Sequence, residues 1–376
     1  GGTDKAVLNG SVSQFNQEGI MPFTDYKNYS AKVGGELKFS EKFRAGMSVN
    51  YIKSGGRRGN SDRYNEALTY YSPRRDVWEY IKPDGTEITI DGAGIDNPIY
   101  LLYGRKYVDD VDRVISNAHF TYSPVKWLDF NYRLGFDIYN DKRTQTTPGP
   151  LGVPDEVYPQ GDFESGTMMV YNINNRIMNS TLMMNIHNNI GAHLQSSFKI
   201  GHDLYEKRRT SSYINAKVAA VPTFYNLSNY QSVEKNSYES DYRIIGLFGD
   251  WTLSWDNFLY LTVTGRNDWT STLSKANRSF FYPSASLSWV FSENIRLPEW
   301  WSYGKARFSV AKIGKDAPSY ATSTGYDIGT ALTTGALPFT LSTQNGDLNL
   351  RPEFTTSYEG GVELRFLHNR LGLDFT

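Results

Sequence analysis

Apolar residues at every second position, in one segment after another, constrain this chain more than any other feature. The pattern runs through residues 29–39, 128–138, 245–255, 281–291 and 358–366, mostly with polar residues or glycine in between. A period of two is that of a β-strand whose two faces meet different surroundings. Many of these segments reach about ten residues, close to the 9–11 that a tilted strand needs to cross a membrane, whereas soluble strands are usually nearer five or six.

The connections between these segments alternate between short and long. Short turns are expected near residues 39–43, 123–127, 187–189, 254–257, 292–301 and 367–369. Long polar loops are expected near 54–110, 141–170, 204–236 and 315–354, with shorter ones near 16–24 and 270–280. Outer-membrane barrels have short turns at the periplasmic end and longer extracellular loops. We therefore predict an all-β fold, a transmembrane antiparallel β-barrel, to which this chain contributes about twelve strands and the start of a thirteenth at 370–376.

Composition agrees with this prediction and excludes several other classes. The 376 residues contain no cysteine, and no apolar run approaches the roughly 18 residues of a membrane helix. A formal net charge of −1 gives no reason to expect nucleic acid as a partner. Aromatic residues make up 15% of the chain. Those near strand ends suit the girdles that hold a barrel in outer-membrane lipid: Trp127, Trp251, Trp255, Phe281, Trp289, Phe291, Trp300 and Trp301.

Several segments, in order along nearly the whole chain, resemble the SusC/RagA-like family of TonB-dependent outer-membrane transporters. These are GGTDK (1–5) with FNQEGI (15–20), GRNDWTSTL (265–273) with NRSFFYPSASLSWVFSE (277–293), ARFSVAKIGKDAP (306–318) and the closing stretch that starts at LRPEFTTSYEGG (350–361). The chain opens and closes inside this pattern, so we expect it to be an internal piece of a longer protein, the first-to-middle part of a barrel.

The resemblance implies a complete barrel of about 22 strands in the outer membrane of a gram-negative bacterium. It also implies a plug domain in the lumen and a TonB-binding segment, both outside this chain, and a SusD-like surface lipoprotein that acts as a lid. Such proteins import oligosaccharides or peptides that are too large for porins, with energy passed through TonB. We keep two alternatives: a passive porin or a barrel component of a surface adhesion or secretion assembly, and a soluble carbohydrate-binding β protein.

Little in the sequence points to catalysis, a cofactor or a metal. His187 and His193 are near one another, but a solvated turn is the better interpretation. The acidic stretch 109–112 lacks the spacing of an EF-hand and is interpreted as a loop end, which leaves open whether a loop binds Ca²⁺. The stretch 55–60, GGRRGN, lacks the ending of a phosphate-binding loop and is interpreted as a flexible loop base. We predict that the protein is not an enzyme.

Two aromatic loops are the candidate substrate-binding elements. Flat rings stack on sugars, and guanidinium groups bind carboxylates. In the first loop, 63–80, the candidates are Tyr64, Tyr70, Tyr71, Arg74, Arg75, Trp78 and Tyr80, with Arg63 beside them. In the second, 223–232, they are Phe224, Tyr225 and Tyr230. The alternative is that these aromatics pack the loops onto themselves or onto the lid.

Two further expectations concern the lumen and the first long loop. Charged residues on the lumen side of strands are expected to hydrate the lumen and contact the plug: Arg133, Asp137, Glu359, Glu363 and Arg365. Asp84-Gly85 lies between two short β-prone runs, so a small hairpin is expected at 80–90.

Overall fold

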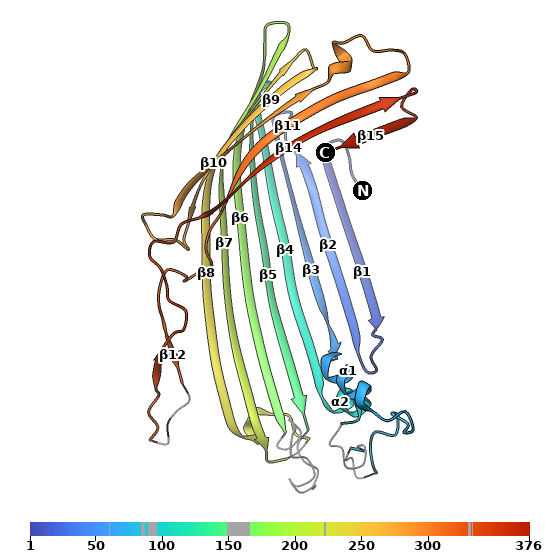
Figure 1. Ribbon diagram of the computed structural model, residues 1–376, viewed down its shortest axis with the longest axis vertical. Coiled ribbons are helices and arrows are strands. Elements are labelled where there is room, and N and C mark those ends of the chain that lie inside the picture. The colour runs from blue at the N-terminus through green and yellow to red at the C-terminus, as the bar shows by residue number, and fades with distance from the viewer. Residues whose placement is uncertain are drawn as a thin grey trace.

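The computed structural model describes residues 1–59, 61–83, 87–88, 96–148, 166–221, 223–329, 332 and 334–376, without the side chains of Ser61 and Arg63. Thirteen strands form one antiparallel sheet in the order β1-β2-β3-β4-β5-β6-β7-β8-β9-β10-β11-β14-β15 (Figure 1). Their bounds are β1 (Ala6–Glu18), β2 (Asp25–Lys38), β3 (Phe43–Arg58), β4 (Lys106–Val125), β5 (Leu128–Thr147), β6 (Thr167–Ile190), β7 (Leu194–Ala219), β8 (Tyr230–Trp255), β9 (Leu259–Thr270), β10 (Ser279–Trp289), β11 (Trp301–Lys315), β14 (Glu353–Phe366) and β15 (Leu371–Phe375).

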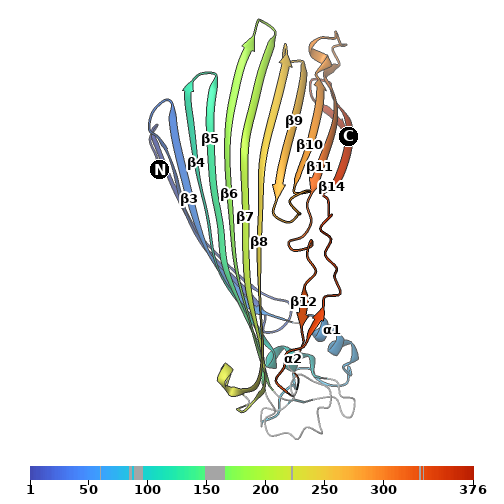
Figure 2. The same cartoon turned by 90° about the vertical axis from the view of Figure 1, so that its left-hand side faces the viewer.

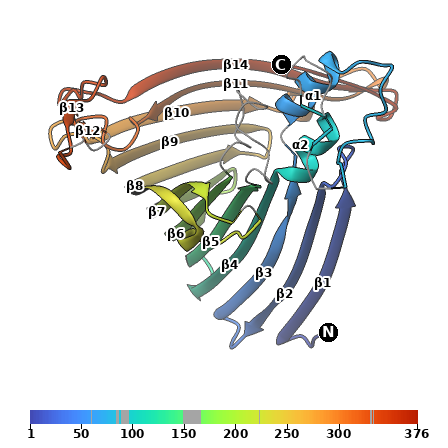
Figure 3. The same cartoon turned by 90° about the horizontal axis from the view of Figure 1, so that it is seen from below.

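The sheet curves into an open arc, as the view along the strands in Figure 3 shows. Its two edges are β1 and β15. The remaining elements lie in the connections: α1 (Ser61–Tyr70), α2 (Pro98–Gly104), η2 (Leu227–Asn229), η3 (Phe291–Glu293) and the small hairpin of β12 (Tyr326–Ile328) and β13 (Phe339–Leu341). Short turns gather at one end of the sheet and longer loops at the other (Figures 1 and 2). No helix among the described residues is long and apolar enough to cross a membrane.

The two faces of the sheet differ in chemistry. On one, which we call the apolar face, Leu253 pairs with Leu261, Leu261 with Leu287, and Leu287 with Phe308. Leu261, Leu287 and Phe308 are exposed and Leu253 is half-buried, as expected for a surface that contacts lipid. On the other, the polar face, Thr252 pairs with Thr262, which pairs in turn with a serine of β10. The period of two in the sequence is thus the alternation between a lipid-contacting and a lumen-facing side.

The strands in the middle of the sheet are much longer than a membrane requires. Strands β6, β7 and β8 have 24, 26 and 26 residues, more than twice the roughly 9–11 needed to cross the hydrocarbon layer. Along the apolar face, Leu204 is followed by Glu206 and Arg208 in β7, and Ile245 is preceded by Arg243 and Asp241 in β8. The apolar band therefore ends part-way up these strands, and the wall continues beyond the membrane on the long-loop side.

The loop predicted at 204–236 is wrong in extent. Strands β7 and β8 stay paired as far as Ala219 and Tyr230, so the connection is residues 220–229. The upper parts of both strands are polar on both faces, and the alternation that marks a membrane strand is missing there. The turn predicted at 187–189 similarly lies at 191–193, because β6 continues to Ile190.

The acidic stretch 109–112 and the Gly-rich stretch 55–60 are also placed differently from the expectation. Asp109, Asp110 and Asp112 lie inside β4, not at a loop end, and Asp109 faces the side opposite to the other two. The carboxylates therefore do not converge on one site. The Gly-rich stretch continues β3 to Arg58, so most of it is paired strand and not a flexible loop base.

The first long connection, residues 59–105, is a small folded unit that we call the loop module. It contains α1 and α2, which the sequence analysis did not anticipate. Within the expected hairpin at 80–90, Ile81 forms a bridge with Glu87, while Asp84 and Gly85 lie outside the described residues.

Candidate functional site

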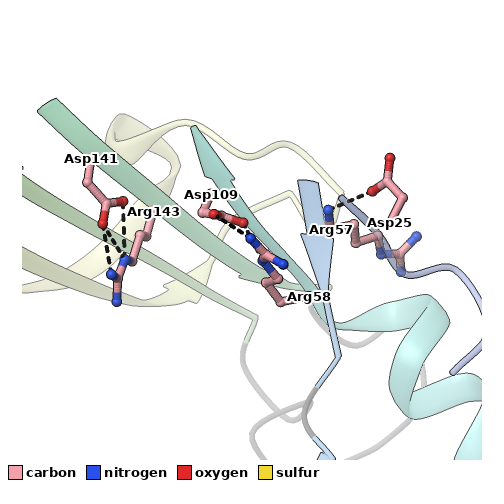
Figure 4. Close-up of polar contacts among 6 residues, drawn as sticks. All are labelled: Asp25, Arg57, Arg58, Asp109, Asp141 and Arg143. Carbon is pink, nitrogen blue, oxygen red and sulfur yellow. Dashed lines mark hydrogen bonds and ion pairs between the residues drawn. The ribbon is translucent and has the colours of Figure 1, made fainter. Parts of the chain in front are cut away.

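The loop module is fastened to the long-loop end of the sheet by Arg57, near the end of β3. Its backbone N–H donates to Oδ1 of Asp25 at 2.7 Å. Its guanidinium donates to the carbonyl oxygens of Leu102 and of Tyr103, the latter at 3.0 Å. The same guanidinium lies 5.4 Å from the ring centroid of Phe23. One residue thus links β3 to β2 through its backbone, as Figure 4 shows, and to the helical loop through its side chain.

Two ion pairs reinforce the same end of the sheet on its polar face. Arg58 donates to both oxygens of Asp109, at 2.7 and 3.0 Å. Arg143 binds Asp141 two residues away on β5, with Nη2 2.8 Å from Oδ2. Figure 4 shows these pairs on adjacent strand ends beside the loop module. A bidentate guanidinium–carboxylate pair fixes geometry as well as charge, so the module rests on a well-ordered base.

The loop module is organised around Asn97, which is fully buried. Its Oδ1 accepts from the N–H groups of Ile99 at 2.8 Å and Tyr100 at 3.3 Å, and so caps α2. Its Nδ2 donates to the hydroxyl of Tyr71 at 3.1 Å and to the carbonyl of Val77 at 3.0 Å. An asparagine cap satisfies helix N–H groups that have no partner within the helix. Asn97 therefore links α2 to the turn that follows α1.

Glu87 is the unusual titratable group of the module. Its side chain is 3% exposed, and its carboxylate accepts the backbone N–H of Asn97. Burial raises the pKa of Glu87 to about 8, and the charge of nearby Asp96 adds to the effect. At neutral pH this carboxyl group is therefore largely protonated.

The candidate residues of loop 63–80 divide into buried and exposed sets. Tyr71 is 8% exposed and hydrogen-bonded to Asn97. Tyr80 packs against Tyr103 and Phe23, with centroid distances of 5.4 and 6.3 Å. These two rings hold the module together, as the packing alternative expected.

The other members of this loop face outward. Tyr70 is 65% exposed and Trp78 58% exposed, and Arg74 and Arg75 are exposed beside them. Tyr64 is half-buried, and the side chain of Arg63 lies outside the described set. The backbone N–H of Trp78 donates to Oδ1 of Asp76 at 2.9 Å, which fixes the turn that presents the indole. The module thus offers two exposed rings and two guanidinium groups.

The second candidate loop is braced by Asn229. Its Oδ1 accepts from Val221 N–H at 2.9 Å, and its Nδ2 donates to the carbonyls of Val221 and Phe224 at 2.8 and 2.7 Å. The Phe224 ring is exposed, whereas Tyr230 is buried. Burial raises the pKa of Tyr225, with a smaller contribution from Tyr103 of the loop module.

A further set of aromatic residues on the polar face was missed by the sequence analysis. Tyr171 and Tyr213 pair across β6 and β7 with ring centroids 6.3 Å apart, and Tyr205 and Tyr242 lie 5.7 Å apart on β7 and β8. Tyr139 of β5 and Tyr282 of β10 lie on the same face. The signal was available for Tyr282, which lies inside the alternating segment 281–291, but not for Tyr205, Tyr213 and Tyr242, which lie in the upper parts of β7 and β8 where the alternation is missing.

The polar face also carries ion pairs between these rings. Arg113 Nε donates to Asp137 Oδ1 at 2.7 Å, so Asp137, one of the expected lumen charges, has a strand neighbour as its partner. Arg365 Nη2 lies 2.7 Å from Glu363 on the same strand. Arg266 contacts Asp268 at 2.8 Å and Asp203 at 3.3 Å. The lining is therefore polar and highly charged, but locally neutralised.

The two histidines near the β6–β7 turn do not share a site. His187 bonds to the Lys126 carbonyl at 2.7 Å, and His193 to Asp256 at 2.7 Å. Over the described part of the chain, no group of three or more His, Cys, Asp or Glu side chains is arranged to hold a metal.

Comparison with known proteins gives the family. The family model described as "TonB dependent receptor-like, beta-barrel" matches residues 50–376. The chain belongs to this family. TonB-dependent receptor P26 of Formosa agariphila is 24% identical over 330 residues, covering 84% of this chain and 32% of that protein. TonB-dependent receptor P3 of the same organism is 23% identical over 402 aligned residues, covering 100% and 38%. This TonB-dependent receptor chain thus spans about a third of the length of the curated relatives it matches.

Solved structures agree in fold. The RagAB peptide transporter matches with a TM-score of 0.82 at 18% identity, covering 100% of this chain and 42% of that one. FpvA of P. aeruginosa, bound to heterologous pyoverdines, matches with a TM-score of 0.56 at 11% identity, covering 98% of this chain and 43% of that one. The predicted membrane barrel and the resemblance to TonB-dependent outer-membrane transporters are confirmed. The chain is part of an outer-membrane protein, and the soluble β-protein alternative is wrong. The family consists of transporters and receptors, not enzymes.

Proposed function

We propose that the complete protein imports large nutrients, oligosaccharides or peptides, across the outer membrane by TonB-dependent transport with a SusD-like lipoprotein as lid. This chain supplies part of the barrel wall, its polar lining and several extracellular loops. Strands beyond β1 and β15 complete a barrel of about 22 strands, because unpaired sheet edges are not tolerated in hydrocarbon. The plug and the TonB-binding segment come from other parts of the protein.

The observation that carries the proposal is the polar face that continues above the membrane with its tyrosines and ion pairs. Strands β6–β8 extend this lining well past the apolar band, and the loop module with Tyr70 and Trp78 sits at its far end. A passive pore needs only a hydrated lumen. A tall aromatic wall suits cargo that is first bound and then passed inward.

The comparison with RagAB supports the lid. That assembly is described as a peptide importer with closed-closed and open-open states. Its barrel chain and this chain share a fold, and the long-loop end here is the end that such a lid would cover. Peptide and oligosaccharide cargo remain equal candidates at this level.

The test is growth of the host on single nutrients with variants of the full-length protein. Trp78→Ala combined with Phe224→Ala removes two exposed rings without touching the module's core. We expect uptake of one nutrient class to fall at least about fivefold, because each ring contributes stacking of about 1 kcal/mol. The matched control is Tyr326→Ala, an exposed ring on β12 outside both loops.

Removal of TonB separates the proposal from its main alternative. For an active importer, uptake of the large nutrient stops in the TonB-deficient host while the protein still reaches the surface. Uptake that persists without TonB would identify a passive porin. Normal growth on every nutrient, with impaired surface adhesion or secretion, would identify the other barrel function.

A further inference from the structure

Strand β8 has a long free edge above the membrane. β7 pairs with β8 from Trp255 all the way to Tyr230. β9, on the other side, pairs with β8 only from Trp255 to Ile244. The upper half of β8 therefore has a neighbour on one side only, and Figures 1 and 2 both show it continuing well past the ends of β9 and β10.

The first hydrogen-bonding positions beyond β9 are occupied by loop residues. Arg243 N–H donates to Oγ of Ser271 at 2.9 Å, and Ser271 N–H donates to the Arg243 carbonyl at 2.8 Å. The N–H of Asp241, which lies two residues before Arg243 in β8, donates to the hydroxyl of Tyr320 at 3.2 Å. Alternate residues of a strand direct their N–H and C=O groups to the same side, so these contacts identify which backbone groups face the free edge.

The next groups on that side belong to Glu239, Ser237, Lys235 and Val233. Among the described residues, none of their N–H or C=O groups has a hydrogen-bond partner there. At about 3.3 Å per residue the segment offers an edge roughly 20 Å long. Unpaired strand edges are templates for the addition of another strand.

This edge also lacks most of the usual protection. Edge strands are commonly shielded by charged side chains, proline or bulges, but the acidic residues here are engaged with β7. Glu234 contacts Lys217 at 3.6 Å, and Glu239 pairs with Arg208. Lys235 is the charged residue of this segment with no ionic partner in the described structure. The backbone edge is thus accessible to an incoming chain.

A cavity of about 480 Å³ lies at the foot of the edge. It is lined by charged and polar residues, among them Arg176, Arg208, Asp241, Arg243 and Tyr320. Arg176 has no ionic partner in the described part of the chain, while Arg243 pairs with Glu206. Its charged residues Arg176, Arg208, Asp241 and Arg243 lie on the outer side of the wall, above the apolar band. The cavity therefore offers room and charge for the end of a chain that arrives from outside the barrel.

We propose that the free edge of β8 binds an extended peptide by strand addition, with one end of the peptide in the cavity at its foot. A row of alternating N–H and C=O groups is complementary to a peptide backbone and not to an oligosaccharide. Binding through the backbone leaves the peptide's side chains free, so many sequences are accepted. This inference rests on the proposed import function and selects peptide as the cargo class.

The test uses purified full-length protein in detergent and a fluorescein-labelled heptapeptide of alternating threonine and lysine. Ser237→Pro removes an N–H that faces the free edge and leaves the pairing with β7 intact, since proline is tolerated on that side of an edge strand. We expect at least about a tenfold loss of affinity, because one ladder bond is removed and its neighbours are displaced. Ser237→Ala keeps the N–H and should bind like the parent.

A second probe needs no variant and is independent of folding. The same heptapeptide N-methylated on every residue lacks backbone donors on both edges, and it should bind the parent at least about tenfold more weakly. Equal binding of both peptides, equal binding by Ser237→Pro, or no binding of the plain peptide at millimolar concentration each overturns the inference. Edge-dependent binding without TonB-dependent uptake would instead refute the import function and leave the peptide site in place.

Discussion

At the scale of single residues, the loop module depends on two buried polar side chains, Asn97 and Glu87, whose hydrogen bonding differs. Asn97 uses both ends of its amide, capping α2 and donating to Tyr71 and Val77. Among the described residues, Glu87 accepts a single hydrogen bond, from the Asn97 backbone, and it lies next to the charge of Asp96. The first is satisfied as it stands, whereas the second is best satisfied when protonated.

Glu87 makes the stability of the loop module depend on pH. Its pKa rises from an ordinary 4.5 to about 8 on folding, so the folded module binds a proton that the unfolded chain releases in this range. Stability is therefore highest below about pH 4.5 and falls as pH rises toward about 8. We expect cleavage of the module by proteinase K to accelerate across the upper part of this window, after correction for the enzyme's own pH profile. Glu87→Gln keeps the acceptor and should abolish the acceleration. An unchanged pH profile in that variant would contradict the assignment.

Asn97→Ala should loosen α2 and the turn it holds. The change removes a helix cap and leaves the buried hydroxyl of Tyr71 and carbonyl of Val77 without their donor, at a cost of about 2–4 kcal/mol. Hydrogen exchange of α2 amides in the full-length protein measures this directly. The matched control is Asn226→Ala, an exposed cap of η2, which should cost about 0.5–1 kcal/mol. Similar exchange in both variants would show that Asn97 is not central to the module.

At the scale of the elements, the apolar band sets which strand positions accept charge. Leu261→Arg places a cation among Leu253 and Leu287 on the lipid-contacting face, which costs about 2–4 kcal/mol near the middle of a bilayer. Thr262→Arg, one residue on, directs the same side chain to the polar face and should cost about 1 kcal/mol or less. The measure is the fraction of full-length protein that reaches the outer membrane in heat-modifiable form. Equal losses in both variants would mean that the faces are assigned wrongly.

The membrane-crossing parts of the strands could be predicted from the sequence, because lipid on one side and water on the other impose a period of two. The upper parts of β7 and β8 could not, since water on both sides imposes no such pattern and 204–236 reads as a loop. The helices of the loop module were equally hidden. The sequence PIYLLYG of α2 is short and apolar, and its cap, Asn97, looks like any loop asparagine. Burial of Tyr71 beside the exposed Tyr70 depends on tertiary packing alone.

At the scale of the whole molecule, the thirteen strands form an arc with two unpaired edges. Within the bilayer, each backbone N–H or C=O group along β1 and β15 that is left without a partner would cost several kcal/mol. Residues 1–376 expressed alone should therefore not insert as a heat-modifiable barrel, whereas the full-length protein should. The assay is gel mobility with and without boiling after reconstitution in lipid vesicles. Stable, heat-modifiable insertion of the short chain would show that the arc closes on itself or by oligomerisation.

At the long-loop end, which Figures 1 and 2 draw at the bottom, the strands reach different distances beyond the membrane. β6–β8 stand high above the membrane, while β9 and β10 end far lower, flanked by the loop of residues 316–352 (Figures 1 and 2). A domain that rested flat on the ends of β6–β8 would therefore meet strand ends on that side, and on the other side it would meet the loop of residues 316–352 with its β12–β13 hairpin. Such a domain would be supported by rigid wall on one side and by a loop on the other.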